Sequence, residues 1–421
     1  MQDHTDPPTA PPAPSGPGAV ALALAGGGPL GAVWEIGALR ALEEACAGRP
    51  LTELDRYVGV SAGSFIAACL ANGIAPAELV RMLFRHEPEE PRFSPGAFFT
   101  PAYREWARRG AALPRHLAAA VGAFRQAAHG NSAAAAVGAL GRLIGALPVG
   151  AFDNEPIRQF VHALFTRPGR SDDFRALRAR LVVVAADLMA ARVVPFGSPG
   201  HDEVPISQAI QASTAVPGVY TPVAIDGRPF VDGAMLKTVH ASAVLDDDVG
   251  LLLVLNPIAP VDATRDRRAP GQPDRVDRVT DLVTLGLGAV LSQTVRAVLH
   301  SRMRTALDGY ARRFPALDVV LLEPAPDELG VFFTDIFSFR ERERLCALAY
   351  QATRRDLRAR FDQLAPALAR HGIELRRDVL DDPDRTLWAG VGLREPRAVP
   401  RTAMERLRHA ARRLDRASAR R

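Results

Sequence analysis

Short uninterrupted apolar runs alternate with segments of helical periodicity through much of the chain. The runs have the length and aliphatic composition of strands buried on both faces, and they are VALALA (20–25), YVGV (57–60), LVVVAADL (181–188) and LLLVLN (251–256). Residues 31–44 and 64–71 repeat apolar positions at helical spacing. Strands that alternate with helices predict a three-layer α/β/α fold with a mainly parallel central sheet.

The other segments divide the chain into regions of different character. Residues 1–18 are a proline-rich leader without helix or strand period, which we expect to be disordered. Residues 19–395 are predicted to form one domain, in which 84–150 is an Ala-rich helical insertion. The part from 279 to 395 is predicted to be mainly helical, with one strand at 318–324.

The composition is that of a folded protein without membrane spans. Of 421 residues, 48% are hydrophobic and 24% are charged, which excludes wholesale disorder. No stretch of about 20 apolar residues is free of charge and proline, and the acidic start lacks the basic region of a signal peptide. Three cysteines are too few for a disulfide framework, which indicates a reducing compartment. We therefore expect a cytoplasmic protein that can also contact a membrane peripherally.

Positive charge is concentrated in the segment 396–421, which we predict to be a separate basic tail. It holds nine arginines against Glu405 and Asp415, so the rest of the chain carries −2 of the total charge of +5. The body therefore has no basic footprint for nucleic acid. We expect the tail to form a helix that adsorbs to anionic membrane through one thin apolar face, made of Met404, Leu407, Ala411, Leu414 and Ser418.

A glycine-rich turn, GGGPLG, follows the first predicted strand. Glycines at such a turn let backbone N–H groups point toward an anion at a helix N-terminus. Gly26, Gly28 and Gly31 also fit the dinucleotide fingerprint G-x-G-x-x-G, but that site needs an acidic residue at the end of the next strand. The next strand ends at Ser61, so the motif alone leaves a phosphate site, an oxyanion site and a plain turn open.

The second predicted strand runs directly into a G-x-S-x-G motif, Gly59 to Gly63, and then into a helix. Flanking glycines permit the sharp turn that lifts a serine oxygen out of the backbone. The positive end of the following helix points at charge that develops near that serine. The context favours Ser61 as a nucleophile over a structural turn.

A third motif, Asp232-Gly233-Ala234, follows the strand-like segment 228–231. On its own a D-G pair predicts a hairpin turn. Of the ten histidines, His240 and His300 follow Asp232 in the chain, so the order Ser…Asp…His of α/β-hydrolases is available. No histidine pair has metal-ligand spacing, and we expect no metal or cofactor.

Together these motifs resemble those of the bacterial patatin-like phospholipases. The matching pieces lie between about residues 20 and 260, and they are GGGPLG, GVSAGS, AADL, QASTAVPGVYTPV and DGRPFVDGA. The resemblance implies a dyad hydrolase of lipid esters, with Ser61 as nucleophile and Asp232 as general base. It also implies an oxyanion hole in the loop Gly26, Gly27 and Gly28, chiefly the last two, with motif support from Gly31, Gly59, Gly63, Gly233 and Ala234.

The chain departs from that family pattern in two places. Leu30 stands where the family usually carries Arg or Lys. The chain therefore lacks a positively charged side chain that could hold a phosphate headgroup at this position. The segment after Ala234 lacks the Asn and Pro that often follow in the family. A Ser-His-Asp esterase, a non-catalytic lipid-binding protein and a dinucleotide-binding oxidoreductase therefore stay open as alternatives.

The insertion at 84–150 is predicted to cover the active site. It carries apolar residues at helical spacing and several phenylalanines, which we expect to line the substrate site: Leu113, Leu117, Val121, Phe124, Phe93, Phe98 and Phe99. The expected substrate is a lipid, most simply a phospholipid, whose headgroup and acyl position the motifs do not specify.

Overall fold

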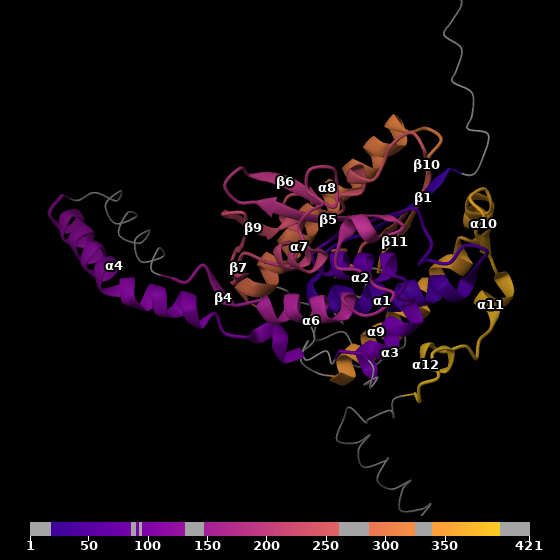
Figure 1. Ribbon diagram of the computed structural model, residues 1–421, viewed down its shortest axis with the longest axis horizontal. Helices are drawn as coiled ribbons and strands as arrows, with labels where there is room; N and C mark the ends of the chain where they lie inside the picture. The colour runs from indigo at the N-terminus through magenta and orange to yellow at the C-terminus, as the bar shows by residue number, and fades with distance from the viewer. Residues whose placement is uncertain are drawn as a thin grey trace, which may run out of the picture.

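A mixed, mostly parallel sheet forms the centre of the molecule (Figure 1). The computed structural model describes residues 18–85, 90–91, 95–130, 147–260, 286–324 and 339–395. The predicted leader up to residue 17 and the basic tail lie outside the described residues. So do residues 131–146 of the insertion.

Eight strands build the sheet in the order β11-β10-β1-β3-β5-β9-β8, with β6 also paired to β5. The first five are mutually parallel, and β6, β8 and β9 are antiparallel to their neighbours. The strands are β1 (Ala19–Leu24), β3 (Arg56–Val60), β5 (Arg180–Asp187), β6 (Arg192–Phe196), β8 (Val223–Ile225), β9 (Arg228–Asp232), β10 (Val249–Leu255) and β11 (Asp318–Leu322). Two small sheets pair β2 (Cys46–Ala47) with β12 (Glu374–Leu375) and β4 (Gly150–Phe152) with β7 (Gly218–Tyr220).

Helices flank the sheet on both faces. They are α1 (Gly28–Ala45), α2 (Ala62–Ala71), α3 (Pro76–Phe84), α4 (Tyr103–Gly130), α6 (Glu155–Phe165), α7 (Ile206–Ser213), α8 (Leu287–Arg313), α9 (Phe339–Ala359), α10 (Phe361–Ala369), α11 (Arg377–Asp381) and α12 (Leu387–Gly390). Four short 3₁₀ turns are η1 (Pro95–Phe99), η2 (Phe174–Ala176), η3 (Gly233–Met235) and η4 (Ala241–Ala243). The predicted three-layer α/β/α architecture is therefore confirmed.

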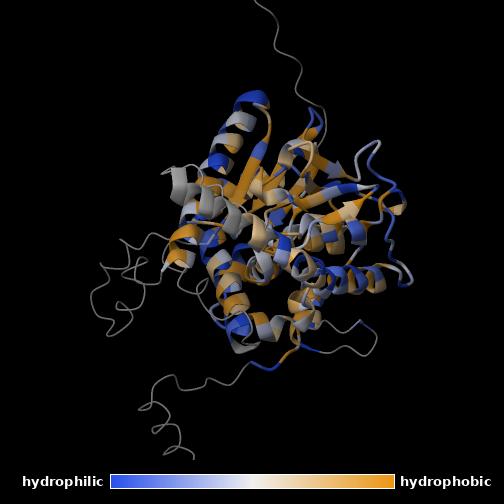
Figure 2. Ribbon diagram, turned by 90° about the vertical axis from the view of Figure 1, so that its left-hand side faces the viewer, coloured by the Kyte–Doolittle hydropathy of each residue, from blue (hydrophilic) through white to orange (hydrophobic). Residues whose placement is uncertain are grey.

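Strand periodicity divides the core into two layers. Leu22 and Leu24 of β1 join the larger hydrophobic cluster with residues of α1, α2 and α9, whereas Ala21 and Ala23 point into a smaller cluster with Met303 of α8. Successive side chains of a strand face opposite sides of a sheet, so a central strand must be apolar at every position. Figure 2 shows the result as hydrophobic strands enclosed by helices with hydrophilic outer faces.

The first helix begins three residues earlier than its apolar period predicted, at Gly28 instead of Gly31. Pro29 explains the difference, because its missing N–H and fixed φ suit the first turn of a helix. The glycine turn is correspondingly short. Gly31 lies in the first turn of α1 and donates its N–H to the carbonyl oxygen of Gly27, at 3.0 Å.

Helix α4 of the insertion does not cover the active site as predicted. Helix α4 extends away from the body (Figure 1), and Leu113 on it is 42% exposed. Helix α4 carries five arginines along its length, which favours its exposure to solvent over burial against the sheet. The prediction that Leu113 lines the substrate site is therefore wrong. Phe93 and the side chains of Leu117, Val121 and Phe124 lie outside the described residues.

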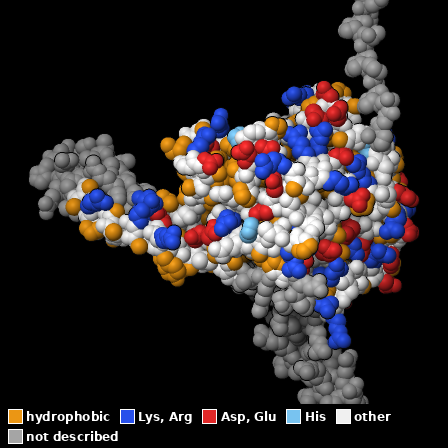
Figure 3. Space-filling model, viewed as in Figure 1, with side chains coloured by type: hydrophobic (Ala, Val, Ile, Leu, Met, Phe, Trp, Pro, Cys, Tyr) orange, Lys and Arg blue, Asp and Glu red, His pale blue; other side chains and the backbone are white. Residues whose placement is uncertain are grey.

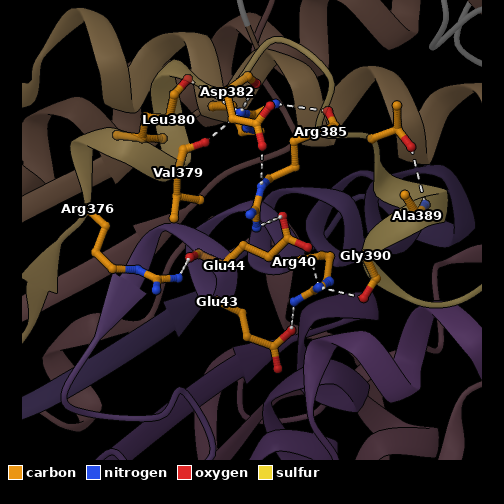
Figure 4. Close-up of polar contacts among 12 residues, drawn as sticks. Arg40, Glu43, Glu44, Arg376, Val379, Leu380, Asp382, Arg385, Ala389 and Gly390 are labelled. Carbon is orange, nitrogen blue, oxygen red and sulfur yellow. Dashed lines mark hydrogen bonds and ion pairs between the residues drawn. The ribbon is translucent and has the colours of Figure 1, made fainter.

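A polar cluster fixes the C-terminal part of the domain to α1 (Figure 4). Arg40 binds both Glu43 and Glu44, and it donates to the Gly390 carbonyl oxygen at 2.9 Å. Glu44, which is buried, also accepts from the Tyr350 hydroxyl of α9 and pairs with Arg385. Segments more than 300 residues apart in sequence are joined here by charge-assisted hydrogen bonds.

Candidate active site

Two strands meet end to end on one edge of β5. Strand β3 pairs with the N-terminal half of β5 and ends at the pair Val60–Val184. Strand β9 pairs with the C-terminal half of β5 and ends at the pair Asp232–Ala185. Strand β6 pairs with Val183 to Asp187 on the opposite edge. Because β3 and β9 run in opposite directions, Ser61 and Asp232 emerge at the same point, beside consecutive residues of β5.

Ser61 occupies a strained turn between β3 and α2. Its φ of 53° is one of three positive values among the described non-glycine residues. Such a conformation costs about 1–3 kcal/mol and persists only where the surroundings enforce it. The Ser61 N–H donates to the Ser213 hydroxyl at 2.8 Å, and Ser213 donates to the Val184 carbonyl oxygen at 2.6 Å. Helix α7 therefore holds the turn against β5.

Asp232 is almost completely buried at the end of β9. Its Oδ1 accepts the Ala234 N–H at 2.8 Å, and its carboxyl group also hydrogen-bonds the Ser61 side chain. Burial raises the pKa of Asp232 to about 6, although both of these hydrogen bonds act to lower it. The Asp-Gly-Ala motif thus forms the start of η3 instead of a simple hairpin turn.

The glycine turn lies directly against these two residues. A Cβ at Gly26 would lie 3.0 Å from the Cβ of Ser61 and 3.2 Å from that of Ala234, so a larger residue there would crowd both motifs. Gly27 precedes the first turn of α1, and Gly28 opens that helix with a φ of 60°. Amides at this position of a helix have no intrahelical partner, and they favour an anion. All three sequence motifs therefore converge on one place.

The supporting motif residues lie where the sequence placed them. Gly59 belongs to β3, Gly63 to the first turn of α2, and Gly233 and Ala234 to η3. Gly31 packs against Pro257, which follows β10. The Leu30 side chain, which stands at the family's usual cation position, is partly buried against the core.

An apolar cavity of about 550 Å³ opens beside Ser61. Its walls come from α1, α3, α6 and η1, and include Val33, Ile36, Met82, Phe98, Phe99 and Phe160. Phe98 and Phe99 therefore line the cavity that contains Ser61, and they belong to the short turn η1 and not to α4. A cavity of this size and lining can take an acyl chain.

Sequence reasoning missed three charged side chains that line this cavity: Arg85, Glu90 and Arg342. Glu90 is ion-paired with Arg170 at 2.8 Å. Arg342, near the start of α9, is only 8% exposed, and burial lowers the pKa of its guanidinium. No local motif marks Arg342, because it comes from a helix more than 280 residues after Ser61.

The two candidate histidines have other partners. His240 is buried, its Nε2 lies 3.2 Å from the Gly233 carbonyl oxygen, and burial lowers its pKa to about 4, so it is neutral at pH 7. The His300 Nε2 lies 3.1 Å from Glu323, which follows β11. The structure therefore brings Ser61, Asp232 and the glycine turn together and gives each histidine a separate hydrogen bond.

Comparisons with known proteins give one family match and several similar solved structures. The family model described as patatin-like phospholipase matches residues 22–245. Similar solved structures include VipD from Legionella pneumophila, at 13% identity and a TM-score of 0.36, covering 82% of this chain and 67% of that one. Two structures of ExoU with SpcU from Pseudomonas aeruginosa match at 16% and 18% identity, with TM-scores of 0.25 and 0.24. They cover 85% and 84% of this chain, which spans 59% and 62% of theirs.

Proposed function

The chain belongs to the patatin-like phospholipase family, and we propose that it hydrolyses acyl ester bonds of phospholipids or related lipids through a Ser61–Asp232 dyad. Family membership supports lipid hydrolysis in general. The observation that carries the finer proposal is the meeting of β3 and β9 on one edge of β5, which brings the buried Asp232 beside Ser61 in the cavity wall.

In the proposed reaction, the Ser61 oxygen attacks the ester carbonyl carbon while Asp232 accepts the hydroxyl proton. The tetrahedral oxyanion is held by N–H groups of Gly27 and Gly28, a type of contact worth about 3 kcal/mol per donor. Collapse of the intermediate expels the alcohol, which takes the proton from Asp232, and leaves an acyl-enzyme. A water molecule then loses a proton to Asp232 as its oxygen attacks the acyl carbon. Collapse of this second intermediate breaks the bond to the Ser61 oxygen, which takes the proton back from Asp232, and the fatty acid is released.

The environment of Asp232 supports its role as the base. A carboxylate with a pKa of about 6 is a stronger base than an ordinary aspartate, yet it is ionised at pH 7. Desolvation is the cause, so no second charged group is required. A histidine relay is not needed for this proton transfer.

The cavity supports a phospholipid as substrate. Its apolar walls suit an acyl chain, and the guanidinium groups of Arg85 and Arg342 suit the phosphate of a headgroup. In this proposal the buried Arg342 supplies positive charge that Leu30 cannot. The absence of an acidic residue at the end of β3, where Ser61 stands, disfavours the dinucleotide alternative.

The test is covalent labelling with a fluorophosphonate probe, followed by mapping of the modified peptide. We expect the label on Ser61, no label on Ser61→Ala, and a loss of short-chain ester hydrolysis of at least about a thousandfold in Ser61→Ala and Asp232→Asn. A folded Asp232→Asn variant with near-parent turnover would contradict the dyad.

Histidine variants complete that experiment. His300→Ala is expected to keep turnover within about tenfold of the parent, because in a dyad no histidine relays a proton. A loss on His300→Ala or His240→Ala as deep as that on Asp232→Asn, in a protein shown by circular dichroism to be folded, would favour the Ser-His-Asp alternative. Lipid binding without any labelling would favour the non-catalytic alternative.

A further inference from the structure

Large apolar side chains that are exposed in the described structure gather at one end of the molecule. Most of them belong to α4, to the first half of α8, and to segments that follow β5 and β9, and the others are Leu147, Val149 and Val219. The segment after β5 follows the carboxyl end of a parallel strand, and Ser61 follows the carboxyl end of the neighbouring strand β3. Soluble monomers rarely expose large contiguous apolar surface, and where they do it marks an interaction site.

Helix α4 contributes one part of this surface. It starts four residues after the cavity-lining Phe99, and Tyr103 and Trp106 at its base are 68% and 44% exposed. Arg104 and Arg115 are exposed on the same helix, and Glu105, the acidic side chain of its described part, is buried in ion pairs with arginines. Figure 3 shows this arm as a mixture of hydrophobic and basic side chains that leaves the body of the protein.

Helix α8 contributes the other part. His300 contacts Glu323, one residue beyond the end of β11, and α8 runs antiparallel to that strand. The turns before His300 therefore extend beyond the carboxyl edge, by about 18 Å at 1.5 Å per residue. Leu287, Leu291 and Val298 on these turns are 73%, 53% and 51% exposed. Residues 287–307 contain no acidic side chain.

We propose that these two helices dock the protein on an anionic lipid bilayer, with the cavity mouth toward the lipid. The docking surface consists of Tyr103, Trp106, Leu113, Leu287, Leu291 and Val298, with Arg104 and Arg115. Aromatic rings with polar tips and arginines match the headgroup region, and the positive charge selects anionic lipid. No described helix is long and apolar enough to cross a membrane, so the contact is peripheral.

This inference rests on the proposed function, because docking at this edge would deliver the lipid substrate to Ser61. Its test is independent of catalysis. All proteins are made in the Ser61→Ala background, so that no vesicle is hydrolysed, and binding to phosphatidylglycerol–phosphatidylcholine vesicles is measured by co-sedimentation. A failure of the labelling experiment would leave the vesicle-binding result valid. A failure of vesicle binding would likewise leave the labelling result valid.

Three full-length double variants probe the surface: Tyr103→Ala with Trp106→Ala, Leu291→Ser with Val298→Ser, and Arg104→Glu with Arg115→Glu. Each is expected to lower the vesicle partition coefficient at least about tenfold. Added salt should weaken vesicle binding by the parent in the same way as the arginine substitutions do, because salt screens the same charges. Arg178→Glu is the matched control, since Arg178 is exposed at the amino end of β5, the opposite edge. It should bind as the parent does.

Three outcomes would overturn the proposal. Parent-like binding by all three folded variants would exclude the docking surface. Loss of binding only in Arg412→Glu with Arg413→Glu would assign the contact to the tail. A sedimentation experiment in which the surface variants convert a dimer to a monomer, with vesicle binding unchanged, would assign the surface to a second copy of the chain.

Discussion

At the scale of single residues, the site depends on Ser61 and Asp232 each being held in an unfavourable state. The positive φ of Ser61 is a backbone strain, and the buried carboxyl group of Asp232 is a desolvated acid. Neither state is stable in an isolated peptide. Both persist because surrounding hydrogen bonds and packing restrict the alternatives, which is common where chemistry requires an exposed oxygen and a strong base.

The raised pKa of Asp232 predicts the pH dependence of turnover. If Asp232 is the base, as proposed, it must be ionised, so kcat/KM for a soluble ester should rise with pH and level off above about 6. A pH profile measured from 4 to 9 checks this expectation. A half-maximal point near 4, the ordinary value for aspartate, would show that burial does not control this carboxyl group.

Because burial raises its pKa, ionised Asp232 lowers the free energy of unfolding at neutral pH. Between its ordinary pKa near 4 and about 6, the folded state binds a proton that the unfolded state has lost, so the free energy of unfolding falls as pH rises. Two pKa units correspond to about 3 kcal/mol. Asp232→Asn should therefore raise the melting temperature at pH 8 and have little effect at pH 4. An equal change at both pH values would contradict this linkage.

At the scale of elements, helix α7 positions Ser61, the proposed nucleophile, through its last residue. Ser213 accepts the Ser61 N–H and donates to Val184 on β5, and it is completely buried. Ser213→Ala would leave a buried N–H and a buried carbonyl oxygen without this partner, which costs about 1–3 kcal/mol each. We expect lower stability together with a fall in kcat, because the turn at Ser61 loses its support.

Ser207 provides the matched control for that prediction. It lies on the same helix and is equally buried, and both its N–H and its hydroxyl bind Asp172 at 2.7 Å. Ser207→Ala should therefore lower the melting temperature comparably and leave kcat close to that of the parent. Equal losses of kcat in the two variants, measured below both melting temperatures, would mean that Ser213 acts only through global stability.

At the scale of the whole molecule, the cluster around Glu44 unites the ends of the described domain. Breaking a buried charge pair by removal of one partner typically costs about 3–5 kcal/mol. Glu44→Ala removes the partner of Arg40, Tyr350 and Arg385 at once. We expect a loss of that order and faster hydrogen exchange in residues 376–395, which dock on α1 through this cluster.

Glu43→Ala is the control for the cluster, because Glu43 shares Arg40 but faces α3, where it accepts the Ala77 N–H. It is more exposed, and its removal should cost less and leave exchange in residues 376–395 unchanged. Hydrogen exchange measured by mass spectrometry resolves the two segments. Faster exchange of residues 376–395 in both variants would indicate general destabilisation instead of a specific clamp.

The sequence by itself determined the local structure and the chemical groups. Continuous apolar runs produced the central strands to within two residues, because a strand covered on both faces has no polar position. The three motifs identified Ser61, Asp232 and the glycine turn, since each requires a distinctive turn chemistry that neighbouring residues encode. These are properties of short segments, and short segments are fully visible in a sequence.

Only the tertiary structure decided how these segments meet. Strands β3 and β9 are separated by more than 160 residues, and their arrival on one edge of β5 depends on pairing that no local pattern specifies. The same is true of Arg342 in the cavity and of the exposed helix α4, for which helical periodicity predicted a lid. Periodicity shows which face of a helix is apolar, but what covers that face is decided by the packing of distant elements.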